Sequence, residues 1–168
     1  MDIIKLVGKY INVPVGPLCY NTDKILTTVL DKKTVEGFAT IILHLASKEG
    51  QNMSQEELLL SYQWLEHVAM YGNQASHNPT FAKNFLQGIN GALEKKSYLT
   101  GHNLTVTDIA VFYAVQPLVR NLTVSEQESL LHLCRWCKHI QAQPNVCSNS
   151  VPIPLNTLTL HILAPAVH

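Results

Sequence analysis

The segment 98–109, YLTGHNLTVTDI, constrains the fold more than any other part of the sequence. Thr105 stands three residues before Asp108, so the threonine hydroxyl can accept a hydrogen bond from the Asp108 amide while the carboxylate accepts one from the Thr105 amide. Leu104 and Ile109 flank this capping box in the positions of a hydrophobic staple. The spacing therefore predicts a helix that begins directly after the threonine, with the aspartate stabilised at its positive end.

This predicted helix, over residues 106–116, has no charged residue after Asp108. A helix that is apolar on every side is buried on every side, so we expect it to be the central helix of a bundle. Of the 168 residues, 46% are apolar and only 14% are charged, a balance opposite to that of a disordered chain. The chain is long enough for one generous domain, or for a small domain joined to a larger one.

Helical spacing of apolar residues recurs on both sides of the central helix, whereas only one segment is rich in β-branched residues. Capping boxes predict two further helix starts, since Ser54 precedes Glu57 and Ser125 precedes Glu128 by three residues. The predicted elements are a short helix at 3–7, a strand at 24–30 with a turn at 31–33, and helices at 34–47, 54–71, 79–93 and 125–142.

The order of these elements predicts an α+β chain. Residues 1–50 form a small α/β unit, and residues 51–147 contain only helical patterns. The tail, 148–168, is punctuated by proline and contains no acidic or basic residue, so no structure is assigned to it.

The charge balance argues for protein partners. Twelve Lys and Arg offset twelve Asp and Glu, and there is no basic run. Direct nucleic-acid binding is disfavoured because it draws on a basic surface, whereas low net charge favours association between proteins. The N-terminus lacks a signal-peptide pattern, and the apolar stretch 109–119 is too short to span a bilayer. We expect a cytoplasmic protein, also entering the nucleus with its partners, with no direct contact to nucleic acid or membrane.

A small α/β unit followed by a helical unit that holds YLTGxxLTxxDI resembles the glutathione-transferase fold. The resemblance implies that 1–50 is a reduced thioredoxin-like unit and that 51–147 is a helical domain of the C-terminal glutathione-transferase type.

A narrower resemblance covers residues 54–147, while the first 47 residues and the tail match much less well. It rests on QWLE at 63–66, YLTG at 98–101, NLT at 103–105, LTV at 122–124, and Arg-Trp at 135–136 followed by HIQ at 139–141. These are similar to the elongation factor 1 epsilon family of small auxiliary proteins of the multi-aminoacyl-tRNA synthetase complex. The resemblance implies a scaffold that binds the glutathione-transferase-like domain of methionyl-tRNA synthetase and, by a second contact, glutamyl-prolyl-tRNA synthetase or another subunit.

The residues that a glutathione transferase needs are missing from the first unit. The fold implies a thiolate holder, a cis-proline and a Glu-Ser-like pair that opens the third helix. Aligning Thr40-Ile41 with the residues after that pair puts Gly37-Phe38 in place of Glu-Ser and Ile25 at the proline position, and residues 18–78 contain no proline. Cys19-Tyr20 could replace the thiolate holder, but nothing is left to bind the tripeptide.

We therefore predict a non-catalytic adaptor without a cofactor. A degenerate transferase that retains glutathione binding is the alternative, and a subunit of the elongation factor 1 complex is a second one. Cys134 and Cys137 form a Cys-x-x-Cys pair in the middle of a predicted helix, on its apolar face and without a second pair. Two buried, reduced thiols explain it better than a zinc or redox site.

The candidate partner-binding residues lie on three predicted helices. On helix 125–142, Arg135 projects away from the apolar face with Glu128 and His139, and the resemblance implies an interface arginine on this helix. Helix 54–71 stacks Leu58, Tyr62, Leu65 and Ala69 on one apolar face, which we expect to be its buried side. A second strip lies beside this face, and the third and fourth helices form the dimer face of the glutathione-transferase fold. This strip consists of Leu59, Gln63, Glu66 and Met70, and His44 on helix 34–47 is a weaker candidate for the same face.

Overall fold

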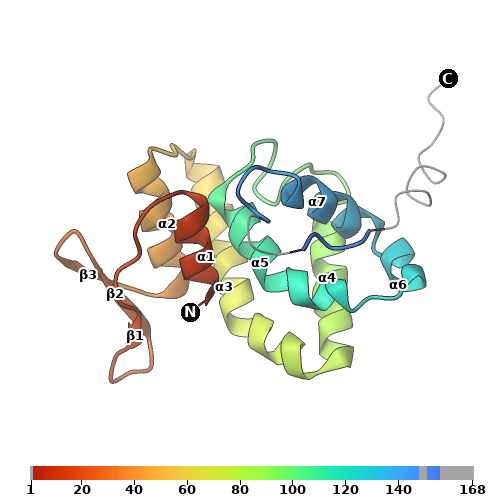
Figure 1. The fold of residues 1–168 in the computed structure, drawn as a ribbon, viewed down its shortest axis with the longest axis horizontal. Coiled ribbons are helices and arrows are strands. Elements are labelled where there is room, and N and C mark those ends of the chain that lie inside the picture. Colours follow the sequence, from red (N-terminus) through yellow and green to blue (C-terminus); the bar gives the residue numbers. More distant parts are fainter. Residues whose placement is uncertain (1, 148–150, 156–168) are drawn as a thin grey trace.

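A computed structural model describes residues 2–147 and 151–155. Helices account for most of this part, and a small antiparallel sheet projects from one end of the helical body (Figure 1). The elements, in chain order, are α1 (Asp2–Tyr10), β1 (Cys19–Tyr20), β2 (Leu26–Leu30), β3 (Lys33–Glu36), α2 (Phe38–Glu49), α3 (Gln55–His77), α4 (Pro79–Ala92), α5 (Val106–Arg120), α6 (Val124–Ser129) and α7 (Leu131–Gln141).

The sheet confirms the predicted strand and turn but corrects the helix that was expected from residue 34. The strands pair in the order β1-β2-β3, with Thr28 opposite Val35, and Asp31 and Lys32 make the turn with positive φ angles of 52° and 63°. Residues 33–36 are a strand because the short turn returns them alongside β2. Gly37, with φ of 90°, then redirects the chain into α2, which ends at a left-handed Gly50 as predicted.

The central helix is confirmed. In α5 every residue from Val106 to Tyr113 is buried, and the helix packs against α1, α2, α3 and α7. It extends past the predicted end at Gln116, through Pro117, to Arg120.

Helix α3 differs from its prediction in length and in the side that it buries. It begins at the predicted Ser54–Glu57 capping box but continues beyond Tyr71 to His77. The buried residues are Ser61, Leu65, Val68 and Ala75, because this side contacts α4 and α5. Leu58, Tyr62 and Ala69, which the apolar periodicity had grouped with Leu65, are exposed.

The predicted helix 125–142 is two helices. The capping box that begins α6 is Thr123 with Glu126, two residues before the predicted pair Ser125 and Glu128. The chain leaves helical geometry at Leu130, where φ is −115° and ψ is 45°, and α7 starts afresh. Glu128 therefore belongs to α6, whereas Arg135 and His139 belong to α7. Helix α4 is confirmed, with Asn78 as its cap and Pro79 in its first turn.

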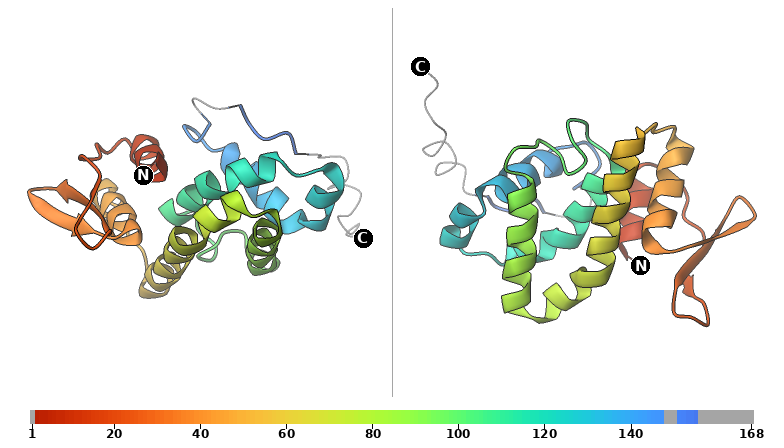
Figure 2. Two further views of the ribbon diagram at one scale, coloured as in Figure 1. Left: turned by 90° about the horizontal axis from the view of Figure 1, so that it is seen from below. Right: turned by 180° about the vertical axis from the view of Figure 1, so that it is seen from behind.

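The buried apolar residues form one continuous core that joins the sheet-bearing part to the helical body. Helices α1 and α2 both pack on α5, as the views from below and behind also show (Figure 2). The division at residue 50 stays a prediction. Residues 151–155 continue past α7, where Ile153 exchanges two hydrogen bonds with the Gln141 side chain, and the rest of the predicted tail lies outside the described residues. Within the described part, no helix combines the length and hydropathy needed to cross a bilayer.

Candidate functional site

The exposed side of α3 carries apolar side chains at helical spacing. Leu59 is 70% exposed and Met70 is 64% exposed, and Gln63 and Glu66 lie exposed between them. The helix runs along one side of the molecule between α2 and α4 (Figure 2, right). Two residues that were predicted to be buried widen the strip, since Leu58 is 40% exposed and Tyr62 is 38% exposed. We call this set the α3 face: Leu58, Leu59, Tyr62, Gln63, Glu66 and Met70.

An aromatic cluster borders the α3 face on the side of α4. The His67 ring stacks on Phe85 with 5.3 Å between ring centroids, and Trp64 and Tyr71 meet His67 edge-on. Burial lowers the pKa of His67. The predicted strip omitted this cluster because an isolated histidine on a helix gives no signal of the phenylalanine that it will stack on. The contact between His67 and Phe85 joins α3 to α4 beside the α3 face.

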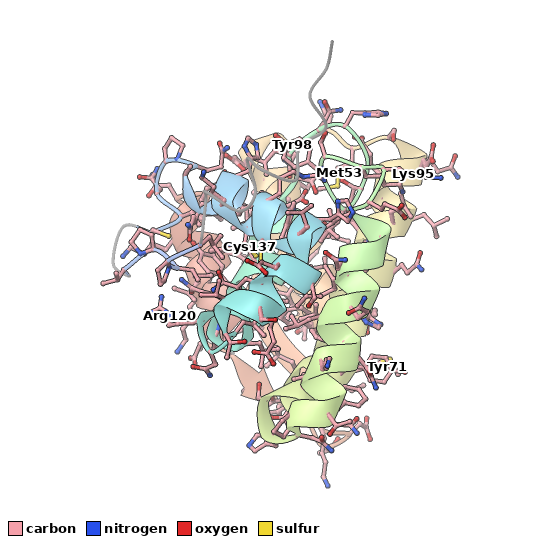
Figure 3. All side chains as sticks on the ribbon, turned by 90° about the vertical axis from the view of Figure 1, so that its right-hand side faces the viewer. Met53, Tyr71, Lys95, Tyr98, Arg120 and Cys137 are labelled. Atoms are coloured by element: carbon pink, nitrogen blue, oxygen red, sulfur yellow. The ribbon has the colours of Figure 1, made fainter. Side chains whose placement is uncertain are left out.

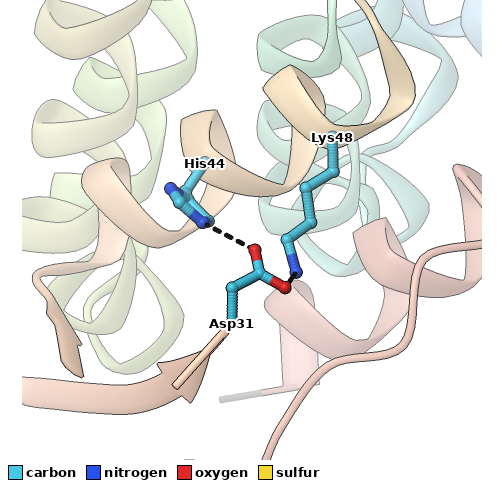
Figure 4. A network of polar contacts seen from close by, with 3 residues as sticks. All are labelled: Asp31, His44 and Lys48. Carbon is cyan, nitrogen blue, oxygen red and sulfur yellow. Dashed lines mark hydrogen bonds and ion pairs between the residues drawn. The ribbon is translucent and has the colours of Figure 1, made fainter. Parts of the chain in front are cut away.

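His44 is occupied by contacts within the chain. Its Nε2 atom lies 3.7 Å from the Asp31 carboxylate, and Lys48 Nζ donates to the same carboxylate at 2.7 Å (Figure 4). The hydrogen bond from Lys48 lowers the pKa of Asp31. Lys48 therefore ties the turn of the sheet to α2, and His44 lies beside the same carboxylate, a position that its place on the helix alone does not indicate.

The outer side of α7 combines exposed polar groups with contacts to the loop after α4. Arg135 is exposed, yet its Nη2 atom donates to the carbonyl oxygens of Leu93 at 2.9 Å and Lys96 at 3.1 Å. His139 Nε2 lies 2.9 Å from the Tyr98 hydroxyl, which stands beside α7 (Figure 3). We call Tyr98, Arg135 and His139 the α7 face. Glu128, predicted on the same helix, is exposed but lies on α6.

A cleft of about 910 Å³ lies between the sheet and the helical body. The start of α2 at Gly37-Phe38 opens onto it, and α3 and α5 line its other side. Its carboxylates come from Asp2 and Glu66, and Lys24 is the lysine among the lining residues. Glu66 therefore belongs both to the α3 face and to the lining of the cleft.

Known proteins are similar in sequence to the part of the chain that carries most of the α3 face and the α7 face. A family model described as the nuclear-export cofactor Arc1p matches residues 59–144. Eukaryotic translation elongation factor 1 epsilon-1 from Cricetulus griseus is 37% identical over 118 residues, which cover 67% of this chain and 67% of that protein. The chain belongs to the elongation factor 1 epsilon family. The mouse relative is 38% identical over 66% of this chain and 65% of its own length, and the human one 34% identical over 67% of each.

A solved glutathione transferase, YghU from Streptococcus pneumoniae complexed with glutathione, has a similar fold. It is 21% identical, with a TM-score of 0.55, and the match covers 77% of this chain and 62% of that one. The likeness shows a glutathione-transferase-like fold for this elongation factor 1 epsilon protein and says nothing of its chemistry. The names of the family relatives indicate a translation-associated factor or cofactor. The matched residues 59–144 contain the α7 face and all of the α3 face except Leu58.

Asp108, in the first turn of α5, is hydrogen-bonded to α7 through the Trp136 side chain. The predicted pairing of Thr105 with Asp108 is confirmed through the carboxylate, whereas the Asp108 amide donates to the Thr105 carbonyl oxygen at 3.1 Å, and Asp108 is fully buried. The Thr105 amide and hydroxyl both donate to Oδ2 at 3.1 Å, whereas the Leu99 amide and the Trp136 indole donate to Oδ1 at 2.9 and 3.0 Å. Burial raises the pKa of Asp108, and these hydrogen bonds lower it in part. One carboxylate thus joins α5, the loop before it and α7.

The two cysteines of α7 are in the core, as predicted. Cys134 is 1% exposed and Cys137 is fully buried, with its side chain directed inward (Figure 3). Burial raises the pKa of Cys134 to about 11 and that of Cys137 well above its ordinary value. Both thiols are therefore protonated at neutral pH and are poor nucleophiles.

Proposed function

We propose that this protein is a non-catalytic adaptor of the multi-aminoacyl-tRNA synthetase complex that supports translation. The α3 face, together with His44 on the neighbouring helix α2, docks onto the glutathione-transferase-like domain of methionyl-tRNA synthetase. The α7 face docks onto a similar domain of a second subunit, glutamyl-prolyl-tRNA synthetase or another. The adaptor works in the cytoplasm and also reaches the nucleus, which imaging of a tagged chain tests.

The observation that carries the proposal is the exposure of large apolar side chains along one side of α3. Leu59 and Met70 stand in water although the same helix buries Leu65 and Val68 completely or nearly so. Covering a Leu or Met side chain contributes about 1.5–3 kcal/mol. An apolar helix face against a helical partner is a recurring docking mode, and the aromatic cluster beside it, which joins α3 to α4, limits the ordering cost.

The α7 face supports a second, different contact. Arg135 is held by two backbone carbonyls, so its guanidinium loses little freedom when a partner binds. Arginines in such settings are frequent interface hot spots. Because the two faces lie on different helices, both partners can bind one adaptor at once.

The test compares two charge insertions. The variant L59E/M70E places carboxylates on the α3 face, and V124E places one on α6, where Val124 is 53% exposed. Calorimetric titration with the isolated methionyl-tRNA synthetase domain measures both. We expect L59E/M70E to weaken binding by more than a hundredfold, about 3 kcal/mol, and V124E to leave it unchanged. Equal binding by both variants removes the α3 face from the proposal.

A degenerate glutathione transferase is the second candidate, and the cleft favours it. A cavity of this size remains where the sheet meets the helices, and the structural neighbour YghU is complexed with glutathione. Two carboxylates and one lysine line it, however, a poor match for an anionic tripeptide. Retention on immobilised glutathione, with turnover of a chlorodinitrobenzene-type substrate, supports this candidate and overturns the adaptor.

The name of the relatives suggests a third candidate, a subunit of the elongation factor 1 complex. Affinity purification followed by mass spectrometry separates it from the synthetase adaptor. Recovery of synthetases supports the proposal, and recovery of elongation factor 1 subunits without synthetases contradicts it.

A further inference from the structure

The α7 face lies among lysines from two elements. Lys95 and Lys96 stand in the loop after α4, and the Lys96 carbonyl accepts a hydrogen bond from Arg135. Lys138 follows Arg135 by three residues, so both lie on neighbouring positions of one helix side. All four side chains are exposed, and Lys95 lies beyond the C-terminal end of α4, at the end of the molecule that also holds Tyr98 (Figure 3). We call Lys95, Lys96, Arg135 and Lys138 the basic patch.

These cations are not neutralised within the described part of the chain. There the ion pairs involve Asp31, with His44 and Lys48, and none of the four cations of the basic patch takes part in them. Helix α7 contains no Asp or Glu. Glu94, exposed in the same loop as two of the lysines, is the carboxylate beside them in the sequence and forms no ion pair there.

Helix dipoles account for only part of this charge. The C-terminal end of a helix carries the equivalent of roughly half a negative charge, which favours one nearby cation. Arg135 already meets the end of α4 through the Leu93 and Lys96 carbonyls. The positive charges of Lys95 and Lys96 are therefore more than the partial negative charge at the end of α4 can balance, and they face the solvent.

We propose that the basic patch recognises an acidic segment of a protein partner, whose Asp and Glu side chains pair with Arg135, Lys96 and Lys138. This inference rests on the proposed function, because it specifies the chemistry of the partner at the α7 face. Charge complementarity of this kind accelerates association and excludes wrongly charged partners. It also separates the two docking faces, since the α3 face offers the exposed apolar side chains of Leu59 and Met70 and no lysine or arginine.

An acidic protein fits the patch better than a nucleic acid. The chain as a whole has a formal net charge of zero, and the patch has four cations with Glu94 beside them. A protein that grips a phosphate backbone commonly neutralises about six to ten phosphates. Nη2 of Arg135 already donates to two carbonyl oxygens, so the N–H groups of Nε and Nη1 are the donors left for a carboxylate of the partner.

The experiment uses the full chain and a fluorescent, amidated Glu-rich helical peptide as probe. Anisotropy titrations compare the wild type, K95A/K96A/K138A and the matched control K5A/K9A/K33A, whose lysines are also exposed. We expect the patch variant to weaken peptide binding about tenfold, to flatten its salt dependence, and the control to change neither. Thermal denaturation checks that both variants are folded.

Each outcome bears on the patch separately from the adaptor role. Equal peptide binding by the two triple variants overturns the patch, whatever the synthetase titrations show. A tRNA transcript that binds more tightly than the peptide and displaces it also overturns it, since the patch is then a nucleic-acid site. If the patch variant loses the peptide while L59E/M70E keeps the methionyl-tRNA synthetase domain, the patch stands and the proposed function of the α3 face fails.

Discussion

The α3 face and the α7 face show two ways in which a small protein can prepare a surface for partners. On α3, Leu59 and Met70 are exposed and make no polar contact, so docking there gains free energy from apolar area removed from water. On α7, Arg135 and His139 are already held by hydrogen bonds to the chain, and the surrounding lysines add charge. The first face depends on area and the second on charge and fixed geometry. Salt, truncation and core mutations should therefore separate them.

The largest effect is expected from Asp108→Ala. The change leaves the Trp136 indole, the Leu99 amide and the Thr105 amide without their buried acceptor. Loss of one partner in such a network costs about 3–5 kcal/mol, and Asp108→Asn, which keeps one oxygen, should cost less. Urea unfolding of both variants measures this. Because Trp136 belongs to α7, binding at the α7 face should fail before binding at the α3 face. Unchanged stability of D108A contradicts the central place given to this carboxylate.

Salt is expected to separate the faces next. Raising the ionic strength from about 0.05 M to about 0.3 M shortens the screening length about twofold. Binding of the second partner at the basic patch should weaken about tenfold, while binding of the methionyl-tRNA synthetase domain at the α3 face should change less than twofold. Calorimetry at the two salt concentrations is the measurement. Parallel losses at both faces indicate that their chemistry is the same.

Arg135→Ala is expected to have a smaller effect on stability. It frees the carbonyl of the exposed residue Lys96, while the carbonyl of the buried residue Leu93 keeps the Lys96 amide as a donor, so the loss should be about 1 kcal/mol. The second partner should weaken and the methionyl-tRNA synthetase domain should not. Arg135→Lys is the control, because it keeps the charge and loses the planar geometry. Full partner binding by R135A removes this arginine from the interface.

The smallest effect concerns the inner side of α7. Cys134 and Cys137 are buried with raised pKa values, whereas Cys19 is exposed. Mass spectrometry after iodoacetamide treatment of the folded chain should find Cys19 modified first and the α7 pair last. The same labelling of R135A and K95A/K96A/K138A separates a changed surface from a loosened helix. Early modification of Cys137 in the wild type contradicts the packing described for α7.

The sequence predicted those features that follow from local chemistry. The pairing of Thr105 with Asp108 and the apolar run after it indicate a capped, buried helix, and Gly50 indicates a helix end. The errors arose where tertiary packing decides. Periodicity could not show that α3 turns Leu58 and Tyr62 outward, and it gave no sign of the break at Leu130. At the candidate site, Arg135 was predicted to be exposed, but its bonds to Leu93 and Lys96 join residues that are distant in the sequence.

The claim that one chain carries two independent docking faces is tested most directly by the mass of its complexes. Light scattering coupled to size exclusion measures the chain mixed with the methionyl-tRNA synthetase domain and the second synthetase domain together. The account predicts that the wild type forms a ternary complex with both domains. L59E/M70E should bind only the second synthetase domain, and K95A/K96A/K138A should bind mainly the methionyl-tRNA synthetase domain. Loss of both domains from either variant, or competition between the domains for the wild type, contradicts it.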